Sequence, residues 1–372
     1  MMRPADQPSA QVETSGRGDL QGLSLESWVV ELETGQLQGQ GQVIWQPEPK
    51  WALTFKGEEI DPSLWVEQLP GSLALSGESK GQVTESGVSA GFMLDRMQGM
   101  VRDYPVTARG QASLDGEILN LTKLQLTSGR NRLTVSGEAG RELALDWRIQ
   151  APELEGVWPG LEGELNGGGR LTGSLQAPRL QAELQAKKLT YDQLQAETVQ
   201  LETDLSLAGN QSLMLDLTAS RLRTPAGDWR QLDLDLSGSL PSHRLSLDLQ
   251  SNAAPRLALE LEAGWSDPGN WQGRIESLAL QPKGQPEWRL AEAAAFQLSP
   301  QRQRLERLCL RAADGGLCGS LDRGVAGEWE TRFDGEGLPL TTLKPWLPQE
   351  WKIQGLLPVS YTHLRAHETA TY

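Results

Sequence analysis

The sequence has few of the residues that serve most catalytic and metal sites. Among its 372 residues are two cysteines and three histidines, and His363 and His367 lie in the last ten positions. His243 remains, in the segment PSHR, where we expect a solvated turn residue. No nucleophile elbow, HExxH or GxxxxGK[ST] string occurs. The sequence therefore predicts no catalytic residue, no metal site and no cofactor, and an enzyme is the least favoured class.

Positive charge and long apolar runs are also scarce. Lys and Arg total 34 against 49 Asp and Glu, which gives a net charge of -15. A nucleic-acid partner is excluded because no basic surface would neutralise phosphates. No stretch of about 18 apolar residues is present, so the sequence contains no candidate membrane-spanning helix.

The two ends do not look like natural termini. Residues 1–19 are polar, lack the apolar stretch of a secretory signal and are expected to be disordered. The segment VSYTHLRAHET from Val359 resembles a translated sequencing adapter, so residues 359–372 are treated as an artefactual tail. We expect the chain to be an internal fragment of a longer protein.

The dominant feature of the sequence is leucine at every second position in four segments. Residues two apart project from the same face of a strand, whereas on a helix they scatter around the axis. The alternation predicts four strands that line one apolar groove. The leucines are Leu213, Leu215, Leu217, Leu232, Leu234, Leu236, Leu245, Leu247, Leu249, Leu257, Leu259 and Leu261.

The other face of these strands is predicted to be solvent-exposed. Asp233, Asp235, Asp248 and Glu260 alternate with the leucines, and turn-forming segments follow at intervals of 12 or 13 residues. This spacing predicts an antiparallel meander. The fold class is therefore all-β, a long and mostly antiparallel sheet curled into an elongated hydrophobic groove, taco-like or β-helix-like.

Helical patterns are limited to two short candidates. These are DPSLWVEQLPG from Asp61 and LPLTTLKPWLPQ from Leu338, while AEAAAFQLS from Ala291 is expected to be a strand. The glycine run at 166–169 is expected to be a turn or bulge rather than a phosphate cradle.

Aromatic spacing indicates a repeat. Trp51-x-x-x-Phe55-x-Gly57-Glu58 matches Trp329-x-x-x-Phe333-x-Gly335-Glu336, and a weaker copy runs from Leu143 to Gly160. Repeating units of roughly ninety residues suggest stacking along one axis. We expect residues 20–358 to form one elongated segment of such units, with the tryptophans as core anchors.

Cys309 and Cys318 flank a turn signal at Asp314-Gly315-Gly316. A hairpin there would bring the two sulfurs opposite each other, which makes a cross-strand disulfide plausible. Two cysteines in this position and none elsewhere favour an oxidising compartment.

Four segments together resemble the TamB family of translocation and assembly module subunits, within the AsmA-like superfamily. The segments are QVIWQP from Gln42, LEGELNGGGRLTGSLQAPRLQAEL from Leu161, LERLCLRAADGGLCGSL from Leu305 and GLPLTTLKPWLP from Gly337. The resemblance implies a periplasmic protein of a Gram-negative bacterium, anchored to the inner membrane, and an outer-membrane partner of the TamA type. The anchor and the partner-binding region of that family are not among these residues. It also implies phospholipid transfer between the two membranes.

The residues support the same mechanism, because acyl chains fit an apolar trough and need no catalytic group. Two alternatives remain open from the sequence. The first is a structural scaffold for outer-membrane protein translocation and assembly, without lipid in the groove. The second is a β-solenoid adhesin, which the Leu/Asp alternation disfavours.

Overall fold

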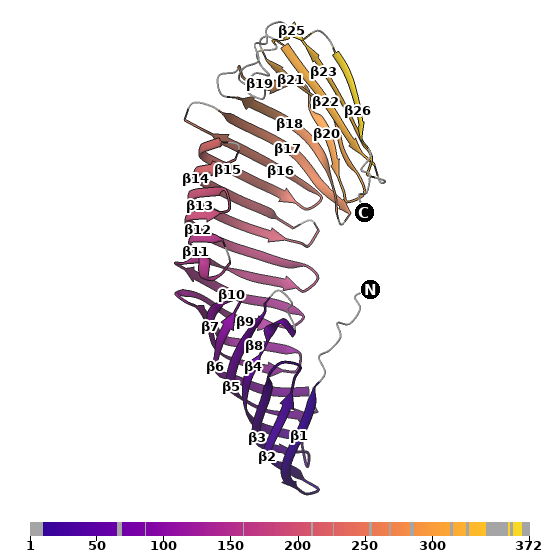
Figure 1. The fold of residues 1–372 in the computed structure, drawn as a ribbon. Coiled ribbons are helices and arrows are strands. Elements are labelled where there is room, and N and C mark those ends of the chain that lie inside the picture. The colour runs from indigo at the N-terminus through magenta and orange to yellow at the C-terminus, as the bar shows by residue number, and fades with distance from the viewer. Residues whose placement is uncertain are drawn as a thin grey trace. The chain divides into compact units, whose positions relative to one another are not determined.

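The structure is a computed structural model of the whole chain (Figure 1). The residues it describes are 10–64, 69–85, 87–158, 160–209, 211–225, 227–252, 255–267, 269–282, 286–312, 315–324, 327–339, 356–357 and 360–366. Over these residues the fold is all-β and antiparallel, as the alternation predicts. The chain divides into two compact units, Met1–Ala186 and Lys187–Tyr372, each described here by itself.

The first unit is a meander in which each strand pairs with the next one along the chain, from β1 to β11. Its strands are β1 (Gln11–Gly18), β2 (Gly22–Glu31), β3 (Gln36–Ile44), β4 (Lys50–Ile60), β5 (Gly71–Thr84), β6 (Gly87–Val101), β7 (Tyr104–Asp115), β8 (Ile118–Ser128), β9 (Asn131–Ala139), β10 (Glu142–Ala151) and β11 (Leu161–Ser174). The boundary between the units falls within β12 (Pro178–Tyr191).

The second unit is also built largely as an antiparallel meander. Its strands are β13 (Leu194–Ser206), β14 (Leu213–Thr224), β15 (Gly227–Ser239), β16 (Ser242–Gln250), β17 (Arg256–Asp267), β18 (Asn270–Gln281), β19 (Trp288–Leu290), β20 (Ala294–Leu298), β21 (Gln303–Ala312), β22 (Gly315–Arg323), β23 (Trp329–Glu336), β24 (Leu338–Pro339), β25 (Leu356–Leu357) and β26 (Ser360–Ala366). β18 pairs with both β19 and β20, and each of these pairs with β21. β24 and β25 form a separate two-stranded sheet.

Aromatic side chains and glycines face one another across neighbouring strands. Trp28 is opposite Gly39, Trp51 is opposite Gly81, Phe55 is opposite Gly77, Trp147 is opposite Gly169 and Phe333 is opposite Gly319. A Cβ atom added to any of these glycines would meet the ring of its partner. The glycines therefore leave room for the rings to lie over the backbone of the adjacent strand.

This pairing explains two features of the sequence. Several glycines and tryptophans of the sequence belong to one packing device used repeatedly, and Trp51 and Phe55 of the repeat both use it. It also corrects the expectation for residues 166–169, which lie inside β11 and form no turn. Gly169 is needed there to accommodate Trp147.

The buried core of the second unit is centred on Leu261, Ala263 and Phe296. Leu245, Leu259, Trp271, Ile275 and Leu305 pack against these three residues. The core therefore draws on β16, β17, β18, β20 and β21 and gathers at one end of the leucine-bearing strands.

Two local expectations differ from the structure. The helix expected from Asp61 is a single 3-10 turn, Pro62–Leu64, where the Asp61 carboxylate accepts from the backbone N–H of Ser63 at 2.9 Å. Residues 65–68 and most of the second helical candidate, from residue 340, lie outside the described residues. Gln11–Gly18, expected to be disordered, forms β1 because its backbone pairs with β2, although every side chain in it is exposed. The tail segment 360–366 pairs with β23 as β26.

Candidate functional site

Backbone register brings the twelve leucines together on one face of the sheet. Leu217 in β14 is opposite Leu234 in β15, Leu234 is opposite Leu247 in β16, and Leu247 is opposite Leu259 in β17. A parallel row joins Leu215, Leu236, Leu245 and Leu261. Directly opposed residues project from the same face, so these rows form a continuous apolar surface across four strands.

The leucine surface extends further than alternation predicts. In β13, Leu201 is opposite Leu217, and in β18, Leu278 is opposite Leu259. The register of β17 and β18 shifts between Glu260 and Leu261, where Ser277 and Ile275 are successive partners. This bulge interrupts the alternation of apolar residues in β18, so a search for leucines at every second position does not find them.

The leucine surface is only partly withdrawn from water. Leu213 and Leu261 are buried, with exposed fractions of 5% and 6%, and the other ten leucines are half-buried. The central row of a closed β-sandwich would be fully buried between two sheets. Over the described residues, this surface therefore keeps an open side.

The acidic residues lie on the opposite face. Asp233 is directly opposite Asp248, and Asp216 is directly opposite Asp235. Asp235 and Glu260 are exposed, whereas Asp233 and Asp248 are half-buried by their neighbours. Arg256 donates to Asp248 at 3.0 Å, which offsets part of the repulsion between the carboxylates.

An aromatic cluster lies at the Leu213 end of the leucine surface. His243 is opposite Gly238 and Ala263, and its ring centroid is 4.9 Å from that of Trp265. The centroids of Trp271 and Phe296 are 4.8 Å apart. His243 is 4% exposed, so the expectation of a solvated turn histidine is wrong. His243 lies two residues before Leu245 and so belongs to the same alternating series as Leu245, Leu247 and Leu249. This alternation is the sequence signal that could have placed it on the buried face.

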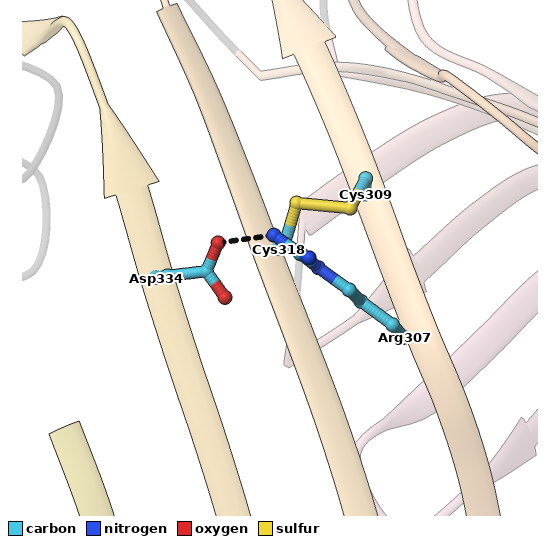
Figure 2. The surroundings of a disulfide bond; sticks show 4 residues. All are labelled: Arg307, Cys309, Cys318 and Asp334. Carbon is cyan, nitrogen blue, oxygen red and sulfur yellow. Dashed lines mark hydrogen bonds and ion pairs between the residues drawn. A yellow bond between two sulfur atoms is a disulfide. The ribbon is translucent and has the colours of Figure 1, made fainter. Parts of the chain in front are cut away.

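Cys309 and Cys318 lie directly opposite each other in β21 and β22 and are joined as a disulfide (Figure 2). Their Cα atoms are 4.0 Å apart. Residues 313 and 314 of the intervening turn lie outside the described residues. Beside the disulfide, Arg307 reaches past β22 to donate to Asp334 in β23 at 2.6 Å (Figure 2). The disulfide and the ion pair together link three successive strands.

The ion pairs of the described residues are mostly solvent-exposed, and several of them join neighbouring strands. Arg302 donates to Asp322 at 2.8 and 3.3 Å, and this hydrogen bond holds the pKa of Asp322 below its usual value. Among the described residues, no group of His, Cys, Asp and Glu side chains is arranged to bind a metal ion. Nor does any helix of the described chain have the length and apolar character that crossing a membrane requires.

Comparison with known proteins gives the family. The family model described as "TamB, N-terminal domain" matches residues 2–362. The translocation and assembly module subunit TamB of Haemophilus influenzae (strain ATCC 51907 / DSM 11121 / KW20 / Rd) is 25% identical over 318 residues, which are 84% of this chain and 24% of that protein. The chain thus spans about a quarter of the length of this relative. Since the family model covers nearly the whole chain, this protein belongs to the TamB family.

Proposed function

We propose that the leucine surface of β14–β17 holds the acyl chains of phospholipids and forms a segment of a conduit between the inner and outer membranes. The observation that carries the proposal is the set of twelve register-matched leucines on one face, ten of them only half-buried. An apolar surface of this kind, left open on one side, is typical of a binding site for an apolar ligand.

Hydrophobic contact alone would suffice for transfer. Each methylene group withdrawn from water contributes about 0.8 kcal/mol. Because successive rows are built from the same residue, an acyl chain that moves by one row exchanges one set of leucine contacts for an equivalent set. The lining thus offers affinity without a deep energy minimum, and the proposed transfer requires no catalytic step.

We place the protein in the periplasm of a Gram-negative bacterium. The Cys309–Cys318 disulfide supports an oxidising compartment, because disulfides are rare in the reducing cytosol. We further propose that the protein is anchored to the inner membrane and acts with an outer-membrane protein of the TamA type.

A structural scaffold for outer-membrane protein translocation and assembly is the second candidate. The name of the relative, a translocation and assembly module subunit, favours this role for that protein. A scaffold would use the same β-structure with the leucine surface covered by protein. The β-solenoid adhesin has no support, since such solenoids stack parallel strands and the pairs here are antiparallel.

Photo-crosslinking distinguishes conduit from scaffold. A photoreactive amino acid is placed at Leu234 or Leu247, with Asp235 as the matched position on the opposite face of the same strand. The conduit predicts phospholipid adducts at the two leucine positions and none at Asp235. Equal lipid labelling at Leu234 and Asp235 would defeat the proposal, and protein adducts alone at the leucine positions would favour the scaffold.

A further inference from the structure

A pocket at one edge of the second unit concentrates positive charge in an acidic chain. It is formed by the ends of β12 and β14 and the beginnings of β13 and β15, where alternate hairpins of the meander turn on the same side. Its lining includes the cations Lys188, Arg221, Arg223 and Arg230 and only two carboxylates, Glu197 and Asp228. The pocket therefore has an excess of positive charge, although the whole chain has a net charge of -15.

Three of the four cations form no ion pair with a described residue. Arg223 lies 3.3 Å from Asp228, and Arg230 donates to the side chain of Gln250 at 3.0 Å. Lys188 and Arg221 are exposed, and neither forms an ion pair with another described residue. Their charges are thus available to an anionic ligand.

The backbone at these two cations is unusual. Lys188 and Arg221 have φ values of 51° and 48°, in the left-handed region that favours glycine and asparagine. Strained positions of this kind concentrate at ligand-binding sites. Here two such positions present long cationic side chains to the same pocket.

The pocket begins where the leucine surface ends. Ala219 and Leu232 are opposite each other in the outermost row, which continues through Leu249 to Leu257. Leu222 and Trp229, which are opposite each other beyond that row, both line the pocket, and Trp229 is 7% exposed. An amphipathic ligand with an apolar chain on the leucines would have its polar end at this pocket.

We propose that this pocket binds a phosphate group, supplied by the phosphodiester of a phospholipid whose acyl chains lie on the leucine surface. The proposal rests on the proposed function for the lipid source of the phosphate. Lysine and arginine are the side chains suited to phosphate, through charge-assisted hydrogen bonds from ammonium and guanidinium groups. Lys188 and Arg221 supply these contacts, with Arg223 and Arg230 adding to the local potential.

Calorimetric titration of the full chain with three probes tests the site. The probes are monomeric dihexanoyl-phosphatidylglycerol, dihexanoylglycerol, which lacks the phosphate, and inorganic phosphate. The double variant Lys188→Asn/Arg221→Asn removes both charges, and asparagine tolerates the left-handed backbone. We expect about tenfold or greater loss of phosphatidylglycerol affinity, as removal of charged hydrogen bonds predicts, with dihexanoylglycerol affinity unchanged.

The matched control is Lys56→Asn/Lys123→Asn, which removes two exposed cations that form no ion pair with a described residue. It should leave both lipid affinities unchanged. Unchanged phosphatidylglycerol affinity in the pocket variant, or an equal loss in the control, would overturn the proposal. If the pocket variant does not fold, the salt dependence of the unsubstituted chain decides. The proposal requires that the affinity for phosphatidylglycerol falls as ionic strength rises while the affinity for dihexanoylglycerol does not. If neither affinity changed with ionic strength, the proposal would be overturned.

The inorganic phosphate probe separates this site from the conduit. If neither lipid binds but phosphate binds and is lost in the pocket variant, the anion site stands with free phosphate as its source, and the acyl-chain proposal fails. If both lipids bind equally well to the pocket variant and phosphate does not bind, the conduit stands and the anion site fails.

Discussion

The indole N–H of Trp271 donates to Nε2 of His243 at 2.8 Å, while Nδ1 of the same imidazole lies 3.1 Å from the carbonyl oxygen of Ser239. Nε2 must accept, so the proton of the neutral ring is on Nδ1, where it can be donated to Ser239. Both ring nitrogens are thus satisfied in a side chain that is 4% exposed. The arrangement ties β16 to β18 across the intervening strand β17.

Replacing His243 with phenylalanine should destabilise the second unit by about 2–4 kcal/mol. The ring volume is retained, but the Trp271 N–H and the Ser239 carbonyl lose their partner, and each unsatisfied buried group costs about 1–3 kcal/mol. Urea unfolding monitored by circular dichroism measures the change. Trp265→Phe is the control, since it alters a ring neighbour of His243 that makes no hydrogen bond to it. Equal effects of the two substitutions would contradict the assigned role of the hydrogen bonds.

Gly81→Ala should destabilise the first unit by about 1–3 kcal/mol through overpacking. An added methyl group would meet the indole of Trp51, which lies over Gly81 from the opposite strand. Gly91→Ala is the matched control, because the nearest atom to its added methyl group is 3.9 Å away. Thermal unfolding of the two variants makes the comparison, and a control that loses as much stability would contradict overpacking against Trp51 as the cause.

Reduction of the Cys309–Cys318 disulfide should lower the free energy of unfolding by about 2–3 kcal/mol, the amount predicted for closing a loop of this size. The two residues are separated by 9 positions in the sequence. Unfolding of periplasmic material with and without reductant measures the effect, and Cys309→Ala/Cys318→Ala should be insensitive to reductant. Two freely alkylatable thiols in unreduced protein would show that the bond does not form.

Acid should weaken the second unit partly through Asp322. The hydrogen bond from Arg302 holds the pKa of this carboxylate below its usual value of 3.8. The ionised form therefore stabilises the fold above that value, and the contribution is lost as pH falls through the lower folded pKa. The pair is solvent-exposed, so the contribution is below about 1 kcal/mol. Asp322→Asn should be less stable than the unsubstituted chain at neutral pH, and this difference should shrink as the pH falls below 3.8. A constant difference across the pH range would argue against the pair.

The sequence predicts the strands and their apolar face because both depend on local periodicity. Leucines at every second position in β14–β17 exclude register shifts of one residue, which would move the leucines of a strand to the other face, and in the structure the leucines stay on one face. The pairing of Cys309 with Cys318 could be predicted because the two residues lie symmetrically about a turn signal. In the structure they are opposite each other.

Features that depend on non-local packing could not be predicted in the same way. The bulge after Glu260 changes which residues of β18 share a face with the leucines, and no local signal marks it. His243 is buried because Trp271, 28 positions later in the chain, supplies its hydrogen bond. The basic pocket likewise joins Lys188 to Arg221 from separate strands, so neither residue stands out in its own segment.

Leu234→Asp should leave the protein folded while it abolishes lipid binding. Leu234 is half-buried at the centre of a leucine row, opposite Leu217 and Leu247, so a carboxylate there would retain water on the open side of the surface. We expect a loss of about 1–2 kcal/mol, against the several kcal/mol that an unpaired charge costs in a closed core. An acyl chain that moves along the surface, however, would have to pass the carboxylate and displace the water that hydrates it.

Thermal unfolding and phospholipid co-purification are measured together. Ser237→Asp is the control because Ser237 lies in the same strand, is exposed and is opposite Arg244. Collapse of the Leu234→Asp variant, with no lipid on the unsubstituted chain, would identify the leucine surface as an ordinary core and favour the scaffold.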